Sequence, residues 1–533
     1  MSLVSPVAPV PLGELGRVHF IGIGGVGMSG IARIMLARGV PVSGSDRAAS
    51  GQLAELAALG ADVHQGHDPA RLAGAGTVVV STAIRESNPE LAEARRAGLR
   101  VLHRAAALAS VMLGRRGIAV AGTHGKTTTT AMITTALRHC GAGPGYVIGG
   151  VLSETGVGAE DGTGPDFVVE ADESDGSFLM LAPEIAVVTC VEADHLDNYP
   201  SLAQIEAAFA SFARRVTPGG CLIASADDPG AREVAAVARE LPVRVRTYGT
   251  AAGADYRVSD IAAAGMAVTL RITGGPAAGG GAAPVTELTA GAPGRHNALN
   301  AAAAFAVATE LGFGAGQVAA GLAAYRGTQR RMELKGEAEG VRVLDSYAHH
   351  PTEIAADLAA ARDLAAGGRV VAVFQPHLFS RTRIFAAEFG AALSLADEVL
   401  VMDVYAARED PEPGVTGELV AAEVTAGKAR FLPARADVPA AAAAAAKPGD
   451  LVLTMGAGDV TALGPLILGE LRARAGRPGG PRPPVPGRGG PGGSSPPAVP
   501  GRGGPGGSSP PAVPGRGGPG GSSPPAGTAQ EPA

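Results

Sequence analysis

The sequence predicts an α/β protein made of three consecutive α/β segments followed by a disordered tail. At 533 residues the chain is longer than one hydrophobic core usually supports, so several domains are expected. From about residue 12 to 474, short β-branched runs alternate with helical stretches, which is typical of parallel sheets with crossover helices. After that the composition changes to Pro, Gly and Ser, which cannot form a core.

The first segment, residues 12–113, opens with a glycine-rich loop. The expected strands and helices are 18–24, 40–45, 77–82, 27–38 and 89–97. Gly22, Gly24, Gly25, Val26 and Gly27 follow the first strand and precede the first helix. Asp46 closes the next strand. Such a loop brings backbone N–H groups to a pyrophosphate, and the acid binds a ribose hydroxyl. An NAD-dependent dehydrogenase, another phosphorylated nucleotide and a plain strand-to-helix turn all remain possible.

The second segment, residues 114–326, contains a second phosphate-binding pattern. Its expected strands are 117–123, 167–172, 184–191 and 220–225. The first of these leads into Gly122, Thr123, His124, Gly125, Lys126, Thr127 and Thr128, and then a helix. In such a loop the lysine contacts β/γ-phosphate oxygens and the threonine hydroxyl contacts Mg²⁺. Val120 replaces the first glycine of the usual pattern. We expect ATP binding here, and a flexible loop at the Gly/Ala-rich stretch 274–284.

Acidic residues follow two strands of this segment. Glu170, Asp172, Glu173 and Asp175 follow one, and Glu192, Asp194, His195 and Asp197 follow another. Carboxyl ends of parallel strands meet at one edge of a sheet, beside the phosphate loop. Mg²⁺ prefers one or two carboxylates together with phosphate oxygens and water. The acids therefore predict a magnesium site, although acids at strand ends also cap helices.

Further polar residues stand at the start of an Ala-rich helix. His296 and Asn300 are four residues apart and share a face, with Asn297 beside them. Asparagine amides can bind an adenine edge. The alternative is that Asn297 serves only as the cap of that helix.

The third segment, residues 327–474, has expected strands at 341–346, 369–375, 398–404 and 450–456. Its polar residues include Arg330, Tyr347, His377, Arg381 and the pair His349–His350 before a proline. Twin histidines suggest zinc, but neither an HExxH motif nor a cysteine partner accompanies them, so zinc is not the favoured interpretation. Arg381, near a strand end, is a candidate clamp for a carboxylate or phosphate, because a guanidinium binds two oxygens at once.

The tail, residues 475–533, repeats VPGRGGPGGSSPPA three times from Val485, Val499 and Val513. A 14-residue period is too short for a solenoid unit, so we expect disorder.

Charge and cysteine content narrow the function classes. The formal net charge is −6, which disfavours a dedicated nucleic-acid or anionic-membrane binder. Cys140, Cys190 and Cys221 have neither metal-ligand spacing nor the number for a disulfide framework. No secretory signal and no long apolar span occur, so a cytoplasmic protein without membrane insertion is expected.

Taken in order, these motifs resemble the Mur ligase family. The resemblance covers about residues 15–470 and rests on HFIGIGGVGMSGIA (19–32), GTHGKTTTT (122–130), EADESDGSF (170–178), EADHLDNY (192–199), GRHNALNA (294–301), RRME (330–333), YAHHPTEI (347–354) and FQPHLFSRT (374–382). It implies a Rossmann-like domain for a UDP-sugar, a central mononucleotide-binding ATPase domain, and a Rossmann-like C-terminal domain that closes over ATP and the amino acid.

The implied reaction joins L-alanine to the lactyl carboxylate of UDP-N-acetylmuramate with ATP and Mg²⁺, through an acyl phosphate, in peptidoglycan synthesis. Catalytic roles would fall to Lys126, Glu170 and His195. The resemblance assigns Thr127, Glu170 and His195 to Mg²⁺; 122–128, His296, Asn297, Asn300 and Arg330 to ATP; Gly24–Gly27 to the UDP diphosphate; and Tyr347, His377 and Arg381 to L-alanine. A recycling ligase that attaches a preformed peptide to the same sugar, or a silent nucleotide-binding regulator, are the alternatives.

Three positions depart from the family pattern. Cys190 stands where an Asn is frequent, Met332 where a Phe is frequent, and Ser346 where a second Asp is frequent. The first two suggest packing changes, and Ser346 leaves no acid–base role at its position.

Overall fold

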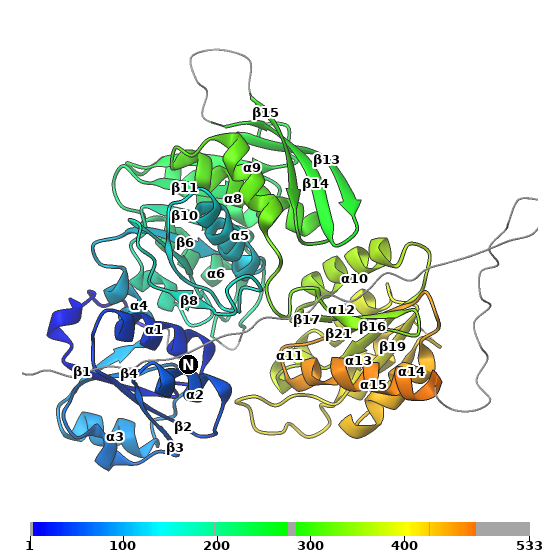
Figure 1. Ribbon diagram of the computed structural model, residues 1–533, viewed down its shortest axis with the longest axis horizontal. Coiled ribbons are helices and arrows are strands. Elements are labelled where there is room, and N and C mark those ends of the chain that lie inside the picture. Colours follow the sequence, from blue (N-terminus) through cyan, green and yellow to red (C-terminus); the bar gives the residue numbers. More distant parts are fainter. Residues whose placement is uncertain (1–3, 197, 276–283, 426, 476–533) are drawn as a thin grey trace, which may run out of the picture. The chain divides into compact units, whose positions relative to one another are not determined.

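The computed structural model describes residues 4–196, 198–275, 284–425 and 427–475. Within them the chain forms three separate sheets in sequence order, each accompanied by helices (Figure 1). The prediction of three α/β segments is confirmed. The predicted tail lies outside the described residues from 476 onward, and so do residues 276–283 of the predicted loop.

The first sheet is fully parallel, with strand order β3-β2-β1-β4-β5. Its strands are β1 (Arg17–Ile21), β2 (Val42–Asp46), β3 (Asp62–Gln65), β4 (Ala75–Val80) and β5 (Arg100–His103). Its helices are α1 (Val26–Ala37), α2 (Gly51–Ala58), α3 (Pro89–Arg96) and α4 (Arg104–Met112). The strand order reverses between β1 and β4, which is where open α/β sheets bind ligands.

One buried carboxylate stabilises this part of the chain. Glu90, at the start of α3, is fully buried. It accepts hydrogen bonds from Ser45 Oγ, from His67 Nδ1 at 3.0 Å and from the backbone N–H of Asp68 at 3.1 Å. Burial opposes its ionisation, but the nearby His19 ring, with Nε2 3.7 Å from Oε1, and the hydrogen bonds from Ser45, Asp68 and His67 lower the pKa of Glu90 to about 2.

Replacing Glu90 with alanine is expected to lower the free energy of unfolding by about 3 kcal/mol or more, because several buried donors lose their acceptor. Thermal and urea unfolding measure this loss. The carboxylate's contribution is complete above about pH 4.5 and disappears as the pH falls toward 2, since the folded-state pKa is the lower one. Glu93→Ala, on the same helix beside the exposed Arg96, is the matched control and should change little. Equal effects of the two substitutions would contradict the prediction.

The second sheet has ten strands in the order β15-β14-β13-β12-β11-β10-β6-β9-β7-β8. They are β6 (Arg116–Ala121), β7 (Gly145–Val147), β8 (Ala159–Glu160), β9 (Asp166–Glu170), β10 (Ile185–Val188), β11 (Cys221–Ser225), β12 (Arg244–Gly249), β13 (Tyr256–Ala264), β14 (Ala267–Gly274) and β15 (Val285–Ala290). Neighbouring strands from β13 to β7 in this order are parallel. β14 is antiparallel to both of its neighbours, β13 and β15, and all three appear as long green strands in Figure 1. The sequence patterns did not predict these three strands.

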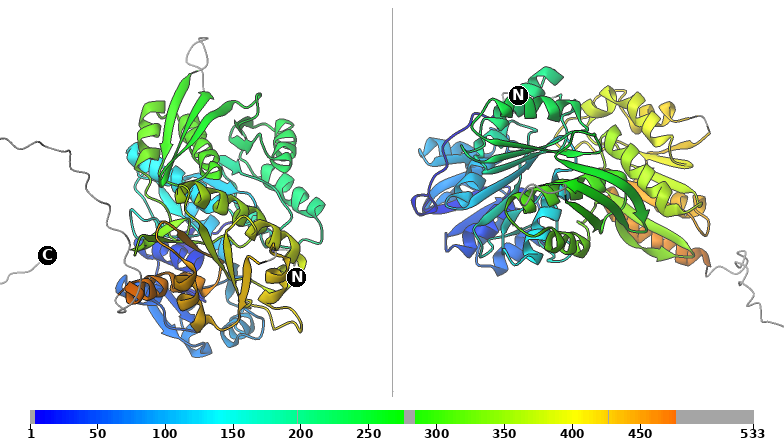
Figure 2. Two further views of the ribbon diagram at one scale, coloured as in Figure 1. Left: turned by 90° about the vertical axis from the view of Figure 1, so that its right-hand side faces the viewer. Right: turned by 90° about the horizontal axis from the view of Figure 1, so that it is seen from above.

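Helices cover both faces of this sheet (Figures 1 and 2). They are α5 (Lys126–His139), α6 (Leu202–Ala213), α7 (Pro229–Arg239), α8 (Arg295–Glu310) and α9 (Ala315–Ala324). Ile118 and Val120 of β6 pack with residues of α5 and α8, while Ala119 and Ala121 pack in the core that includes α6 and α7. Because alternate residues face opposite layers, a strand buried on both faces is apolar throughout. That explains the unbroken apolar run before the phosphate loop.

The third sheet has the order β16-β17-β21-β18-β19-β20, parallel except for β16. Its strands are β16 (Glu333–Ala338), β17 (Val341–Ser346), β18 (Val370–Phe374), β19 (Glu398–Met402), β20 (Ala429–Leu432) and β21 (Leu451–Met455). Its helices are α10 (Pro351–Ala365), α11 (Phe379–Ile384), α12 (Ala386–Leu393), α13 (Gly417–Glu423), α14 (Val438–Ala445) and α15 (Leu463–Ala475). Two hydrophobic cores lie on the two faces of this sheet. One contains α10, α12 and α13, the other contains α14 and α15, and alternate residues of the central strands belong to each.

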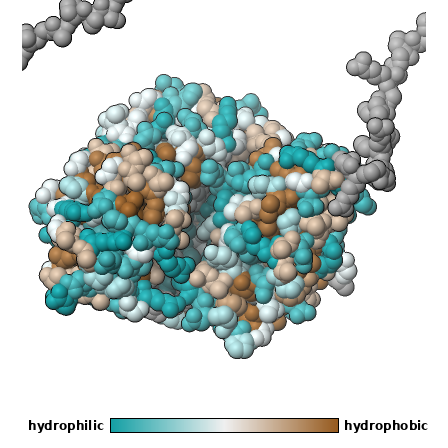
Figure 3. Space-filling model, turned by 60° about the horizontal axis from the view of Figure 1, so that its bottom comes forward, coloured by the Kyte–Doolittle hydropathy of each residue, from teal (hydrophilic) through white to brown (hydrophobic). Residues whose placement is uncertain are grey.

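The surface carries hydrophilic and hydrophobic residues side by side on the face shown in Figure 3. In the described part of the chain, every helix is too short or too polar to cross a bilayer. The three cysteines are free thiols, and Cys221 is buried in β11.

Candidate active site

The phosphate loop between β6 and α5 has a backbone that requires glycine. Gly122 and Gly125 have φ values of +137° and +81°. A Cβ atom at Gly122 would lie 1.9 Å from Thr189 Oγ1, and one at Gly125 would lie 2.7 Å from Asn300 Oδ1. Both positions therefore need glycine for the loop to adopt this conformation, which places Lys126 at the start of α5.

Lys126 lies within its own loop and against an acid. Its Nζ donates to the carbonyl of Gly122 at 2.7 Å and to Glu173 Oε1 at 2.8 Å. Burial opposes the charge, yet the carboxylates of Glu173, Glu170 and Asp172 hold the pKa of Lys126 above its ordinary value. The ammonium is thus kept charged at the place where phosphate oxygens meet such a loop.

Two of the three predicted magnesium ligands, Thr127 and Glu170, are in direct contact. Thr127 Oγ1 lies 2.9 Å from Glu170 Oε2, which also accepts the backbone N–H of Gly149 at 2.7 Å. His195, with a φ of +54°, joins the cluster through Glu173, 3.6 Å from its Nε2. The hydroxyl of Thr127 beside the carboxylate of Glu170 fits a divalent ion next to phosphate oxygens, whereas the contact of His195 is with the neighbouring Glu173.

A cavity of about 330 Å³ adjoins the loop. Its walls include the predicted ATP residues His124, Gly125, Thr128, His296, Asn297 and Asn300, together with Tyr248, Asp227 and Glu353. Asn300 Nδ2 donates to Asn297 Oδ1 at 3.0 Å, and Asn297 Nδ2 donates to the carbonyl of Pro293 at 2.7 Å. Gly294 is the N-cap of α8, so the alternative of Asn297 as that cap is wrong. The volume of this cavity suits a nucleoside.

The two arginines after residue 329 lie differently. Arg331 lines the cavity and donates to Thr127 Oγ1 at 3.0 Å. Arg330, the predicted ATP residue, has a φ of +61°. Its Nε lies 3.4 Å from the buried Asp345, and its guanidinium lies over the Tyr347 ring at 4.8 Å. Arg330 is absent from the cavity walls in the described residues. The structure thus brings Arg331 closer than Arg330 to the phosphate loop.

The residues predicted for L-alanine gather around His349. Its ring centroid lies 5.2 Å from that of Tyr347 and 6.2 Å from that of His377. Burial, then the charges of His349 and Arg381, lower the pKa of His377 to about 3, and burial lowers that of His349 to about 4. Both imidazoles are therefore neutral near pH 7, and neither adds charge to an amino-acid site.

Arg381, in α11, forms a buried ion pair across the chain. Its Nη2 donates to Asp194 Oδ1 at 2.7 Å, and both side chains are less than one-tenth exposed. Asp194 also accepts the backbone N–H of His195. The pair joins the third segment to the loop that carries His195, so Arg381 is no solitary surface arginine.

The glycine-rich loop after β1 is built to accept a ligand closely. The backbone N–H of Gly24 donates to Asp46 Oδ2 at 2.9 Å, and a Cβ atom at Gly24 would lie 2.9 Å from that oxygen. Gly25 is the N-cap of α1, which begins at Val26. Arg104, unnoticed in the sequence, pairs with Asp172 and lies 3.6 Å from a Cβ placed on Gly27. Arg104 thus connects this loop with the acidic residues that follow β9.

Comparison with known proteins identifies the family. Residues 17–116, 120–308 and 330–458 match the family models of the Mur ligase catalytic domain, the Mur ligase middle domain and the Mur ligase glutamate ligase domain. The UDP-N-acetylmuramate–L-alanine ligase of Thermobifida fusca (strain YX) is 58% identical over 482 residues, which cover 88% of this chain and 100% of that protein. The chain belongs to the Mur ligase family.

Other relatives agree. The UDP-N-acetylmuramate–L-alanine ligase of Kineococcus radiotolerans is 57% identical, covering 86% of this chain and 97% of its own. Among solved structures, the UDP-N-acetylmuramate–alanine ligase MurC of Thermotoga maritima superposes with a TM-score of 0.72 at 28% identity, covering 86% of this chain and 99% of that one. A murein peptide ligase from Psychrobacter arcticus gives 0.64 at 26% identity, with coverages of 86% and 99%.

This Mur ligase is an ATP-dependent amide-forming enzyme, so the dehydrogenase interpretation of the first glycine loop is wrong. The family also explains two phosphate-binding loops in one chain. Two of the three departures have local partners. Cys190 Sγ accepts the backbone N–H of His124 at 3.3 Å, and Ser346 Oγ donates to the buried Asp357.

Several contacting residues of this Mur ligase were missed in the sequence: Glu173, Asp194, Arg104, Arg331 and Glu353. Glu173 and Asp194 stood in the acidic motifs, but nothing there distinguished a partner of Lys126 or of Arg381. Twin arginines likewise do not reveal which one faces the cavity.

Proposed function

We propose that this enzyme joins L-alanine to UDP-N-acetylmuramate, with conversion of ATP to ADP and phosphate. The observation that carries the proposal is the 58% identity, over 88% of this chain, with a relative named UDP-N-acetylmuramate–L-alanine ligase. The geometry supports it: a phosphate loop, an acidic strand edge and a cavity for a nucleoside lie together, with Arg381 at the same edge. We assign residues 12–113 to the UDP-sugar, 114–326 to ATP and 327–474 to the amino acid. A cytoplasmic location suits an enzyme that consumes ATP.

A second cavity, of about 740 Å³, supports a site for the sugar nucleotide. Its walls come from the first segment, the acidic loop and the third segment, and include Thr82, Arg85, His103, Asp175 and Arg408. Cationic side chains there suit a diphosphate and a carboxylate. In the proposed arrangement the sugar extends from Gly24–Gly27 toward this edge.

The proposed chemistry has two steps. The lactyl carboxylate attacks the γ-phosphorus of ATP, which forms an acyl phosphate and releases ADP. The amine of L-alanine then attacks the acyl carbon, loses a proton, and expels inorganic phosphate from the tetrahedral intermediate. Phosphorylation is needed because a carboxylate has only oxide as its leaving group. Both steps depend on positioning and charge neutralisation rather than on a covalent enzyme intermediate.

The residues divide this work. Lys126 neutralises charge on the β/γ-phosphate oxygens. Arg331 lies beside the same loop, where it donates a hydrogen bond to Thr127 Oγ1. Thr127, Glu170 and His195 would hold Mg²⁺, which when bound neutralises phosphate charge. We assign His195 to the metal rather than to a base, because an imidazole among carboxylates suits a divalent ion. Burial opposes charge on this ring, but Asp194 and Glu173 raise its pKa, so a bound ion would take the place of a proton. Arg381 would orient the carboxylate of L-alanine, leaving the amine free.

Phosphate release with purified enzyme tests the proposal. With ATP, Mg²⁺ and UDP-N-acetylmuramate, we expect sustained release only after L-alanine is added. A panel of L-alanine, glycine, L-serine and the preformed tripeptide decides between this reaction and peptide recycling. Preference for the tripeptide, or release that ignores the amino acid, would refute the proposal.

A further inference from the structure

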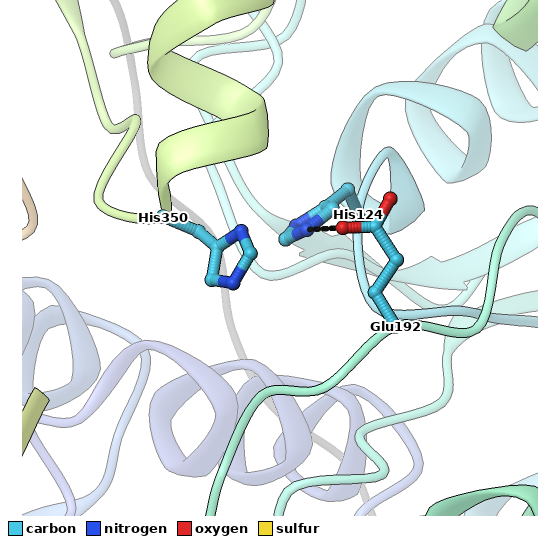
Figure 4. Close-up of side chains that lie close together, drawn as sticks. All are labelled: His124, Glu192 and His350. Carbon is cyan, nitrogen blue, oxygen red and sulfur yellow. Dashed lines mark ion pairs between the residues drawn. The ribbon is translucent and has the colours of Figure 1, made fainter. Parts of the chain in front are cut away.

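Three potential metal ligands from distant parts of the sequence meet beside the phosphate loop. His124 lies in that loop, Glu192 follows β10, and His350 is the N-cap of α10. One ligand atom from each lies within 4.8 Å of the others. Figure 4 shows the two imidazole rings facing each other and the Glu192 carboxylate directed at His124. None of the roles proposed for binding ATP, Mg²⁺, the UDP-sugar or L-alanine requires these three residues together.

Two ring nitrogens in this cluster make no hydrogen bond of ordinary length in the described part of the chain, although that of His124 lies 3.6 Å from Glu192 Oε2. Nε2 of His124 and Nε2 of His350 are buried, without a hydrogen-bond partner in the described residues. His350 is only 5% exposed. Its Nδ1 receives one long contact, 3.4 Å from the backbone N–H of Thr352. Buried nitrogens of this kind call for an explanation, and a bound ion supplies one.

The surroundings orient His124 as a metal ligand. Its Nδ1 lies 3.3 Å from Glu353 Oε1, on the opposite side of the ring from Glu192, whose Oε2 is 3.6 Å from Nε2. A carboxylate on the second nitrogen of a ligating histidine fixes the ring and raises its basicity. Glu192 is itself held by Thr352 Oγ1 at 2.8 Å.

We propose that His124, Glu192 and His350 bind a divalent transition-metal ion, with Zn²⁺ the best match. Two imidazoles and one carboxylate are a common zinc donor set, whereas Mg²⁺ prefers oxygen ligands, so this site is chemically different from the one at Thr127 and Glu170. Tetrahedral zinc with bonds of roughly 2.0–2.1 Å places its ligands about 3.4 Å apart. The ligand atoms, now within 4.8 Å of one another, therefore move together by up to about 1.4 Å on an ion, and water completes the coordination.

Binding has a definite local cost. Burial opposes charge on His124, but the carboxylates of Glu192 and Glu353 beside its ring raise its pKa to about 9, so a bound ion takes the place of the proton on Nε2. Coordination through Nε2 of His350 puts the ring proton on Nδ1 and ends the long contact with Thr352. In return the ion links the phosphate loop to α10, two segments more than 200 residues apart in the sequence.

Calorimetric titration of the full-length chain with Zn²⁺, in excess Mg²⁺, tests this site without any ligase assay. We expect one ion per chain and a rise in the melting temperature, because a ligand that binds only the folded state stabilises it. His350→Asn removes the imidazole but keeps a good N-cap for α10, and Glu192→Gln keeps an acceptor for Thr352. Each should weaken zinc binding by about tenfold or more.

The matched control is His64→Asn, which removes a partly exposed histidine of β3 and should leave zinc affinity unchanged. Melting curves without zinc show whether each variant folds. Zinc affinity equal to that of the unaltered chain in both folded variants would overturn the proposal, as would the absence of binding at micromolar zinc. Because binding is the readout, these outcomes stand apart from the proposed ligase reaction.

Discussion

Replacing Lys126 with alanine is expected to lower turnover by about two to three orders of magnitude or more, because the ammonium neutralises charge that develops during phosphoryl transfer. Binding of the UDP-sugar should stay nearly unchanged, since the Gly24–Gly27 loop belongs to another sheet. Steady-state phosphate release and calorimetric titration with UDP-N-acetylmuramate measure the two effects. Activity within tenfold of the unaltered enzyme would refute the assignment.

The structure shows which controls this experiment needs. Lys126→Ala leaves the carboxylate of Glu173, which is 2% exposed, without its nearest cation. A loss of stability is therefore expected as well, and melting curves separate it from the loss of chemistry. Lys126→Ala combined with Glu173→Gln removes the unpaired charge and should stay inactive. Lys447→Ala, at an exposed lysine of the third segment, should retain full activity.

Replacing Arg381 with lysine is expected to raise the apparent KM for L-alanine by about 10- to 100-fold, because an ammonium cannot reproduce the two-pronged contact with a carboxylate. The KM values for ATP and UDP-N-acetylmuramate should stay within a few-fold. Kinetics with each substrate varied in turn measure the three constants. If all three move together, or none moves, Arg381 is not the clamp.

The ion pair with Asp194 means that the Arg381→Lys experiment must separate a structural role from a role in binding L-alanine. Arg381 Nη2 already contacts a buried carboxylate, so the arginine has a structural role besides any role in binding. A purely structural role predicts the same loss of stability in Arg381→Lys and Asp194→Asn, with no selective change for L-alanine. Arg383→Lys is the matched control: it lies two residues along α11, is half exposed, and pairs with Glu412 at 3.0 Å. It should change neither stability nor any KM.

The local patterns predicted the parallel core well. The strands around both phosphate loops fall within a few residues of their predicted ranges, because fully buried parallel strands are continuous apolar runs. The edge strands were missed. β13, β14 and β15 carry alternating or Ala-rich sequences, and their pairing depends on antiparallel neighbours that a local pattern does not reveal.

The sequence by itself determined the two glycine loops, Lys126 and Thr127, because a phosphate loop needs these residue types at fixed, short spacing. Only the tertiary structure decided which acid contacts which partner. Glu173 contacts Lys126, Glu170 contacts Thr127, and Asp194 contacts Arg381. The order of strands β9, β6 and β10 places their acidic ends beside the loop, and contacts with the third segment bring in Arg331 and Arg381. Such long-range contacts depend on how the helices and strands pack, and this packing cannot be predicted from local sequence patterns.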